Sequence, residues 1–395
     1  MSWEPALLAD GFVNLFGAAG ALVVAAEYQR TDPRGAVSCR IGFALRFVAL
    51  LFLVRALAWS TGNVLALVVV DWLAAITPLV TLIVAEGLLR RHAPQWLKLT
   101  LCLGPAAIVI SSFTPFQPPA LLLADVVLGF SAVTLLVLFR DRGSLTSAEN
   151  TTIRRLLGAF AFLALLTITD FRSIWPEIPV RLGAVGALIV LYVGLGPGQM
   201  QSSIATRFAD LGIFLATSAL IAAGYVAIAP SVETSHLVQV AVISFCGMIA
   251  AALFAEARGA RAESNRTIVP IIEATSPTGF LDCLRRHPLL GDVHMLEGSV
   301  LDPLRHPAFD ALLFAQPVLR RAAAPWGRPT EDEGVERALS LMSAHEATHL
   351  MVLAHQPLRI IAIAVPAIAA SARTEGEIQI ARRIGQVVYA GEAAS

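Results

Sequence analysis

A single stretch decides the fold: HLVQVAVISFCGMIAAALFAEARGARAESNR, residues 236–266. Its first part, from Leu237 to Ala255, is apolar except for Gln239 and Ser244, and it is long enough for a helix to cross a bilayer. The second part is charged and contains no proline, so the same helix can continue into water. We therefore expect membrane-embedded chain before this stretch and a soluble domain after it.

The composition agrees with a membrane protein. Of the 395 residues, 56% are hydrophobic and only 15% are charged, which is too apolar for an ordinary soluble chain of this size. The formal net charge is zero, so no basic field points to a nucleic-acid partner. The amino terminus carries Glu4 and Asp10 in place of a basic flank, which argues against a cleaved signal peptide.

The four cysteines give no framework for disulfides or zinc. Cys39, Cys102, Cys246 and Cys283 are widely spaced, and none forms a CxxC pair. We expect neither a disulfide scaffold nor a zinc knuckle.

Nine apolar spans precede the soluble part and predict a polytopic bundle of about nine helices. They cover residues 7–26, 41–60, 64–88, 97–113, 119–139, 153–171, 180–196, 208–229 and 237–256. Arg and Lys gather in every second gap, beginning with Arg30, Arg34 and Arg40, whereas the other gaps hold only Arg172 and Arg181. The positive-inside rule then places the amino terminus outside and the carboxyl domain in the cytoplasm.

The residues after the last span predict a small α+β domain. Helices are expected at 278–287, Glu333–Ala344 and Thr374–Tyr389, because apolar residues recur there at helical spacing. Val293–Leu301 and Phe309–Phe314 have the composition of strands, and Thr348–Ala354 with Arg359–Val365 predicts a β-hairpin. The expected organisation is a transmembrane domain at 1–258, a linker helix at 259–275 and a soluble domain at 276–395.

The carboxyl part resembles a known family. The order of helix, hairpin and closing helix from Leu339 to Val388, with Thr374, Glu375 and Glu377 opening the last helix, looks like the second half of a GAF domain. GAF domains of this type occur in membrane-bound sensor histidine kinases, whose multi-helix sensor regions the first part is similar to in layout. In this pattern Trp326 is an apolar core anchor. The chain has no phosphoacceptor helices or ATP-binding boxes, and it lacks a cyclic-nucleotide signature.

One local motif suggests metal chemistry instead. His345-Glu346-Ala347-Thr348-His349 is an HExxH sequence, with His355 following it. On a helix, His345, His349 and His355 would bind zinc while Glu346 polarises a water, as in metallopeptidases. Against this, Val352 stands where metzincins need a glycine, and the second histidine falls in the predicted hairpin. We expect no metal or cofactor, and keep zinc as the alternative.

Charged residues inside the predicted spans are the leading site candidates. Arg55, Asp71, Asp125 and Asp170 all fall in the outer half of the membrane in the expected topology. Arg55 is expected to pair with Asp71 or Asp125, and the group is either a structural ion pair or a pocket that senses a ligand or protons. Nearer the inner side, Arg207 and Asp210 are spaced for a local pair.

These observations together favour a signalling protein over an enzyme. The expected function is a bacterial inner-membrane sensor that passes a signal from the bundle to the GAF-like domain, which acts through a separate kinase or other signalling protein. A further expectation is that two copies of the chain dimerise through the helix at 237–266. The alternatives are a membrane-anchored zinc metallopeptidase and a proton-coupled transporter.

Overall fold

The chain forms two compact units. The computed structural model describes residues 5–31, 35–89, 91–114, 119–140, 147–172, 174–175, 177–196, 204–228, 233–263, 269–272, 274, 276–287, 290, 292–321, 333–365 and 372–394. The first unit comprises Met1–Asp141 with Thr152–Ala260, and the second comprises Arg142–Thr151 with Arg261–Ser395.

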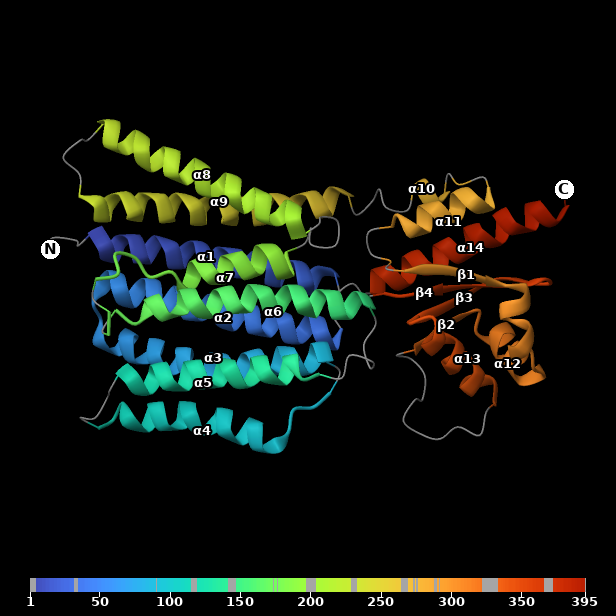
Figure 1. Cartoon of the computed structure of the whole chain (residues 1–395), viewed down its shortest axis with the longest axis horizontal. Coiled ribbons are helices and arrows are strands. Elements are labelled where there is room, and N and C mark those ends of the chain that lie inside the picture. Colours follow the sequence, from blue (N-terminus) through green and yellow to red (C-terminus); the bar gives the residue numbers. More distant parts are fainter. Residues whose placement is uncertain are drawn as a thin grey trace. The chain divides into compact units, whose positions relative to one another are not determined.

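The first unit is a helical bundle in which most helices run along a common direction (Figure 1). In chain order these are α1 Pro5–Thr31, α2 Ala36–Thr61, α3 Val64–Leu89, α4 Gln95–Ser111, α5 Pro119–Leu138, α6 Ser147–Thr167, α7 Gly183–Val190, α8 Ile204–Ile228 and α9 Thr234–Glu263. A 3-10 turn, Ile168–Asp170, follows α6, and a π-helical turn, Leu191–Leu195, extends α7.

Six helices in the described part of the chain are long and apolar enough to cross a membrane, judged by length and composition. They are α1, α2, α3, α5, α8 and α9. Two shorter apolar helices, Gln95–Ser111 and Gly183–Leu195, and the helix α6 coincide with the remaining predicted spans. The prediction of apolar helices long enough to span a membrane is therefore confirmed, whereas the crossing of a membrane by nine helices stays a prediction.

The connection between α2 and α3 shows how the sequence sets the ends of the helices. Gly62 adopts a left-handed conformation with φ of 65° and donates its N–H to the Ala58 carbonyl, which ends α2. Asn63 follows, and its Oδ1 accepts the N–H groups of Leu65 and Ala66 at 2.9 and 3.2 Å, which caps α3. This tight turn brings the last turns of α2 and the first turns of α3 to the same end of the bundle.

The second unit contains a four-stranded antiparallel sheet in the order β1-β4-β3-β2. Its strands are β1 Val293–Glu297, β2 Val318–Arg320, β3 His349–His355 and β4 Leu358–Ile363. Its helices are α10 Val269–Ile272, α11 Pro277–Arg285, α12 Pro307–Ala315, α13 Glu333–Ala344 and α14 Ala372–Ala394.

Helices cover both faces of this sheet (Figure 1). Leu350 and Val352 of β3 share one core with Phe309 of α12 and Met342 of α13. On the other face α14 approaches closely at Gly385, where an added Cβ would lie 2.7 Å from Leu353 and 2.8 Å from Phe280 of α11. Strand β3 is therefore apolar on both faces, which explains the near-continuous run of apolar residues in its sequence.

Most of the predicted elements of the second unit are confirmed, but one strand is wrong. The hairpin and the helices at 278–287, Glu333–Ala344 and Thr374–Tyr389 correspond to β3–β4, α11, α13 and α14. Phe309–Phe314 is not a strand because it lies in α12, where the His306 side chain accepts the Ala308 N–H and Pro307 occupies the first turn. Strand β1 also ends at Glu297, earlier than predicted, and the short strand β2 had no signal strong enough to predict it.

Two predictions concern residues that the structure does not describe, in whole or in part. Trp326, the predicted core anchor, lies outside the described residues. The predicted linker helix at 259–275 is described as the end of α9 and the helix α10, and residues 264–268, 273 and 275 lie outside the description.

Candidate functional site

A cluster of charged side chains lies at one end of the helical bundle. Arg55, in the penultimate turns of α2, forms an ion pair with Asp170, whose carboxylate oxygen is 2.5 Å from the guanidinium. The two side chains are only 11% and 5% exposed. Charges buried at this depth are costly unless they are paired, so this pair is a strong constraint on how α2 packs against the end of α6.

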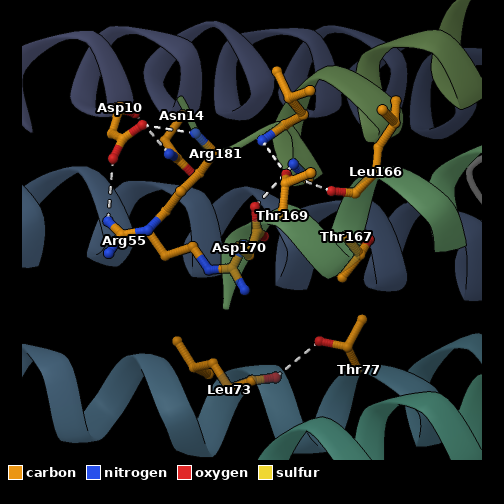
Figure 2. A network of polar contacts seen from close by, with 12 residues as sticks. Asp10, Asn14, Arg55, Leu73, Thr77, Leu166, Thr167, Thr169, Asp170 and Arg181 are labelled. Carbon is orange, nitrogen blue, oxygen red and sulfur yellow. Dashed lines mark hydrogen bonds and ion pairs between the residues drawn. The ribbon is translucent and has the colours of Figure 1, made fainter. Parts of the chain in front are cut away.

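The same aspartate caps the start of α7. Asp170 Oδ1 accepts the Gly183 N–H at 2.9 Å, and the neighbouring Thr169 hydroxyl accepts the Leu182 N–H at 2.8 Å. Figure 2 shows both side chains beside Arg181, at the beginning of this helix. The first N–H groups of a helix have no partners within the helix, and a carboxylate there is also favoured by the helix dipole.

Asp10 of α1 joins the cluster from the opposite side (Figure 2). Its carboxylate is fully buried and accepts the Arg181 N–H at 2.9 Å and the Arg181 guanidinium at 3.2 Å, with Arg172 at 3.4 Å. The Arg181 guanidinium also lies over the Trp59 ring at 3.8 Å, and Arg55 lies 5.6 Å from the same ring. Two arginines and three aromatic or acidic partners thus form one continuous network, which we call the polar cluster: Asp10, Arg55, Trp59, Asp170 and Arg181.

A cavity of about 450 Å³ opens beside the polar cluster, within the first unit. Arg55, Asp170, Arg181 and also Asp71 line one end of it. The rest of the lining is mostly apolar, with a few Ser and Thr hydroxyl groups, and comes from α2, α3, α4, α5, α6 and α7, reaching Leu89 at the end of α3. The volume falls within the range of about 300–1,000 Å³ that is typical of small-molecule sites.

The four predicted site residues do not all converge. Arg55, Asp71 and Asp170 border the same cavity, and the ion-pair partner of Arg55 is Asp170 instead of Asp71 or Asp125. Asp125 lies apart from the cavity lining, and its carboxylate occupies the position where a side chain on Gly104 of α4 would stand, 1.7 Å from an added Cβ. Its Oδ2 is buried and has no hydrogen-bond partner among the described residues.

Gly183 offers a test of the contact that holds Asp170. An added Cβ at Gly183 would lie 2.1 Å from Asp170 Oδ2, so Gly183→Ala must push the carboxylate away from Arg55. We expect a loss of about 1–3 kcal/mol in stability, the usual cost of overpacking, seen as a lower thermal midpoint in lipid nanodiscs. Gly158→Ala on α6 is the matched control, because nothing lies within 4 Å of that Cβ. An equal effect of both substitutions would contradict the contact.

A second buried pair lies in the bundle between α8 and α9. Arg207, only 4% exposed, forms an ion pair with Glu256 of α9 and lies over the Tyr192 ring at 4.5 Å. Tyr192 belongs to the π-helical turn after α7 and donates its hydroxyl to Asp210 at 2.9 Å. The predicted local pair of Arg207 with Asp210 is therefore wrong, because α9 supplies a closer carboxylate and Tyr192 engages Asp210.

The HExxH motif does not assemble a zinc site. Helix α13 ends at Ala344, so His345 and Glu346 lie in a turn and His349 begins β3. His345 lies against His294, His349 binds Glu375, and His355 stacks on Phe314 with the ring centroids 3.9 Å apart. Across the described residues no three His, Cys, Asp or Glu side chains are grouped so that they could hold a metal ion.

His349 instead joins a polar network at the start of α14. Its Nε2 lies 3.0 Å from Glu375, which Arg320 of β2 also contacts at 3.1 Å, and its Nδ1 lies 2.8 Å from the Thr348 hydroxyl. Burial alone would raise the pKa of Glu375, but the hydrogen bond and charge of His349 and the charge of Arg320 outweigh it and hold this pKa below its ordinary value of 4.5. Glu375 therefore favours the fold in its ionised form.

This lowered pKa predicts an acid-dependent stability. Glu375→Gln should lower the unfolding midpoint of the second unit above pH 4.5, and the difference from wild type should vanish as the pH falls through the lower folded pKa. The full chain suits this measurement when Cys39, Cys102 and Cys246 are replaced by serine, because alkylation of Cys283 in α11 then reports unfolding of this unit. A difference that persists unchanged at low pH would contradict the network.

Sequence patterns missed Asp10 and Arg181 as members of the polar cluster. Asp10 lies within an apolar span and precedes Asn14 by one helical turn, a polar pair that could have marked α1 as facing other charges. The link to Glu256 was hidden because this residue stands at the boundary between the apolar and charged parts of the stretch 236–266.

Comparisons with known protein families, with curated proteins and with solved structures find no match to this chain.

Proposed function

We propose that the protein is a sensor or signalling protein of the bacterial inner membrane, which passes a signal from its helical bundle to its soluble domain. In this proposal nine helices cross the membrane, with the amino terminus outside and the second unit in the cytoplasm. The output is made by contact with a separate partner such as a kinase, and two copies of the chain can pair through α9.

The observation that carries this proposal is the polar cluster at one end of the internal cavity. Buried charges inside an apolar bundle cost several kcal/mol each, and such residues typically mark ligand sites, ion paths or switches. The pair of Arg55 with Asp170 borders an internal volume large enough for a ligand. Occupation of that volume would act directly on the contacts that hold α2, α6 and α7 together.

Helix α9 supplies the route by which the signal leaves the bundle. It is a continuous helix from Thr234 to Glu263 and is the last element of the first unit. Cys246, Ile249, Leu253 and Ala257 form a buried stripe on it, whereas Phe254 and Arg258 are exposed. A rotation of α9 would exchange these two faces and would strain the pair of Glu256 with Arg207.

The arrangement of the second unit supports a GAF-like role. Helix α13, the hairpin β3–β4 and the closing helix α14 follow one another in the order that the resemblance implies, and helices cover both faces of the sheet (Figure 1). A domain of this kind has no output chemistry of its own, so the proposal assigns the output to a partner.

Single cysteines along α9 test the proposal. In a chain whose four native cysteines are replaced by serine, Leu253→Cys and Ala257→Cys should react slowly with a maleimide, and Phe254→Cys and Arg258→Cys quickly. When Asp170→Asn is added, the maleimide reaction rates of the buried and the exposed cysteines should become more similar, because the loosened polar cluster lets α9 rotate. Glu86→Gln, which breaks the pair of Glu86 with Lys98 outside the cavity, is the control. An unchanged pattern with Asp170→Asn would contradict the coupling.

One observation favours a second candidate, a proton-coupled transporter. Asp125 is a carboxylate in an apolar helix whose Oδ2 lacks a hydrogen-bond partner among the described residues, as in sites that bind a proton during transport. Proton uptake into proteoliposomes that depends on Asp125, and stops in Asp125→Asn, would favour this candidate.

A further inference from the structure

We propose that the cavity binds a long-chain amphiphile with a cationic, hydrogen-bond-donating head group, held by Asp71. This inference rests on the proposed function and deepens it, because it names the class of ligand that the bundle would detect.

Asp71 is the carboxylate at the polar end of the cavity that remains available. Asp170 is bound by Arg55 and by the Gly183 N–H, and Asp10 by Arg181. Asp71 lines the same end and forms no hydrogen bond or close ion pair with any residue that the structure describes. A cation or a strong hydrogen-bond donor from the ligand would complete this site at low cost.

The hydroxyl groups of the lining reinforce this preference for a donor. Five hydroxyl groups of the lining each donate their only proton to a backbone carbonyl of their own helix, at oxygen–oxygen distances of 2.6–2.9 Å. These are the hydroxyl groups of Thr77, Thr81, Ser111, Ser112 and Thr167. A hydroxyl whose proton is committed in this way can only accept further hydrogen bonds. These hydroxyl groups therefore present acceptors, which match an ammonium group better than a carboxylate, although Ser112 already accepts the indole N–H of Trp72 at 3.1 Å.

The arginines do not reverse this preference. Arg55 is already neutralised by Asp170, and Arg181 by Asp10. A carboxylate head group would have to displace one of these buried partners and would also stand beside the negative charge of Asp71. An ammonium head group meets Asp71, which has the charge of Arg55 nearby but no hydrogen bond or close ion pair with a described residue, and it displaces no existing contact.

The rest of the cavity fits a long apolar chain. On α3 the lining continues from Asp71 to Leu89, which spans about 27 Å along the helix at about 1.5 Å per residue. Its walls are aliphatic and aromatic side chains such as Phe52, Phe130 and Phe160. A long and mostly apolar site, whose charged lining residues are Arg55, Asp71, Asp170 and Arg181, selects a chain with a single head group over a compact polar ligand.

Photolabelling of the full chain in lipid nanodiscs tests the ligand class. The probe is hexadecylamine with a diazirine in its chain, and the matched probes are hexadecanol and hexadecanoic acid with the same diazirine. We expect saturable labelling of peptides from α3, α5 and α6 by the amine, at concentrations at least tenfold lower than for the acid. Asp71→Asn should abolish this preference, Asp71→Glu should keep it, and Asp125→Asn, outside the cavity, should leave it unchanged.

Two further experiments distinguish a membrane lipid from a free amine as the ligand and show that loss of labelling is not caused by misfolding. Nanodiscs of phosphatidylglycerol with added phosphatidylethanolamine show whether a membrane lipid with an ammonium head competes, or only the free amine does. Either result supports the proposal. Ala74→Phe, which fills the cavity, should remove all labelling while the thermal midpoint shows that the chain is folded. Stronger labelling by the acid, or a preference for the amine that survives Asp71→Asn, would overturn the ligand class, but the cysteine pattern on α9 would still test the proposed function.

Discussion

Asp170→Asn is expected to lower the stability of the bundle by about 3–5 kcal/mol, the largest effect of a single substitution in the polar cluster. The amide still offers an oxygen to the Gly183 N–H, so α7 keeps its cap. What is lost is the negative charge that pairs with Arg55, whose side chain is only 11% exposed. The thermal midpoint of the full chain in nanodiscs measures the effect.

A double substitution separates the charge from the packing. Arg55→Met combined with Asp170→Asn removes both charges and keeps most of the side-chain volume, so it should recover most of the stability lost by Asp170→Asn alone. If the double variant is as unstable as the sum of the single variants, the two residues do not interact as a pair.

Arg207→Met is the second substitution with a large expected effect. It leaves Glu256 without the guanidinium that pairs with it in the bundle, and it removes the cation from the Tyr192 ring. Because the Glu256 side chain is 24% exposed, the loss of this ion pair should cost about 1–3 kcal/mol, and the cost should appear as earlier exposure of α9 during thermal unfolding. Alkylation of the buried Cys246 on α9 reports this exposure.

Arg207→Lys is the control for this prediction. Lysine keeps the positive charge near Glu256 but lacks the planar guanidinium that lies over Tyr192. It should therefore lose only part of the stability. If lysine and methionine behave alike, then the stacking on Tyr192 dominates and the ion pair contributes little.

Elements with a long and regular pattern of apolar residues could be predicted from the sequence, because the spacing of those residues fits either a helix or a strand but not both. In the stretch 236–266, α9 is continuous as far as Glu263, where the description of this stretch ends, and the two apolar runs around His355 form the hairpin β3–β4. The prediction for Phe309–Phe314 failed for a physical reason: a short run of five apolar residues and one aspartate fits a strand or about two turns of helix equally well. The hydrogen bond from the Ala308 N–H to the His306 side chain and the position of Pro307 in the first turn favour the helix. The spacing of apolar residues does not reveal these contacts.

The candidate site was predictable in its residue types but not in its pairs. Charges within apolar spans singled out Arg55, Asp71 and Asp170, and the structure places all three in the lining of one cavity. The choice of Asp170 as the partner of Arg55, 115 positions away, depends on how α2 packs against the end of α6, and no local pattern carries this information. Asp125 was misplaced because a rotation of α5 by part of a turn decides whether it faces the cavity or Gly104.

In the proposed function, the polar cluster of the bundle is coupled to the second unit. The most direct test is hydrogen–deuterium exchange of the full chain in nanodiscs, comparing wild type, Asp170→Asn and the control Glu86→Gln. Coupling predicts that Asp170→Asn changes the exchange of peptides from β3 and α14, whereas Glu86→Gln does not. If the exchange of the second unit is identical in all three proteins, the bundle does not signal to it and the account is wrong.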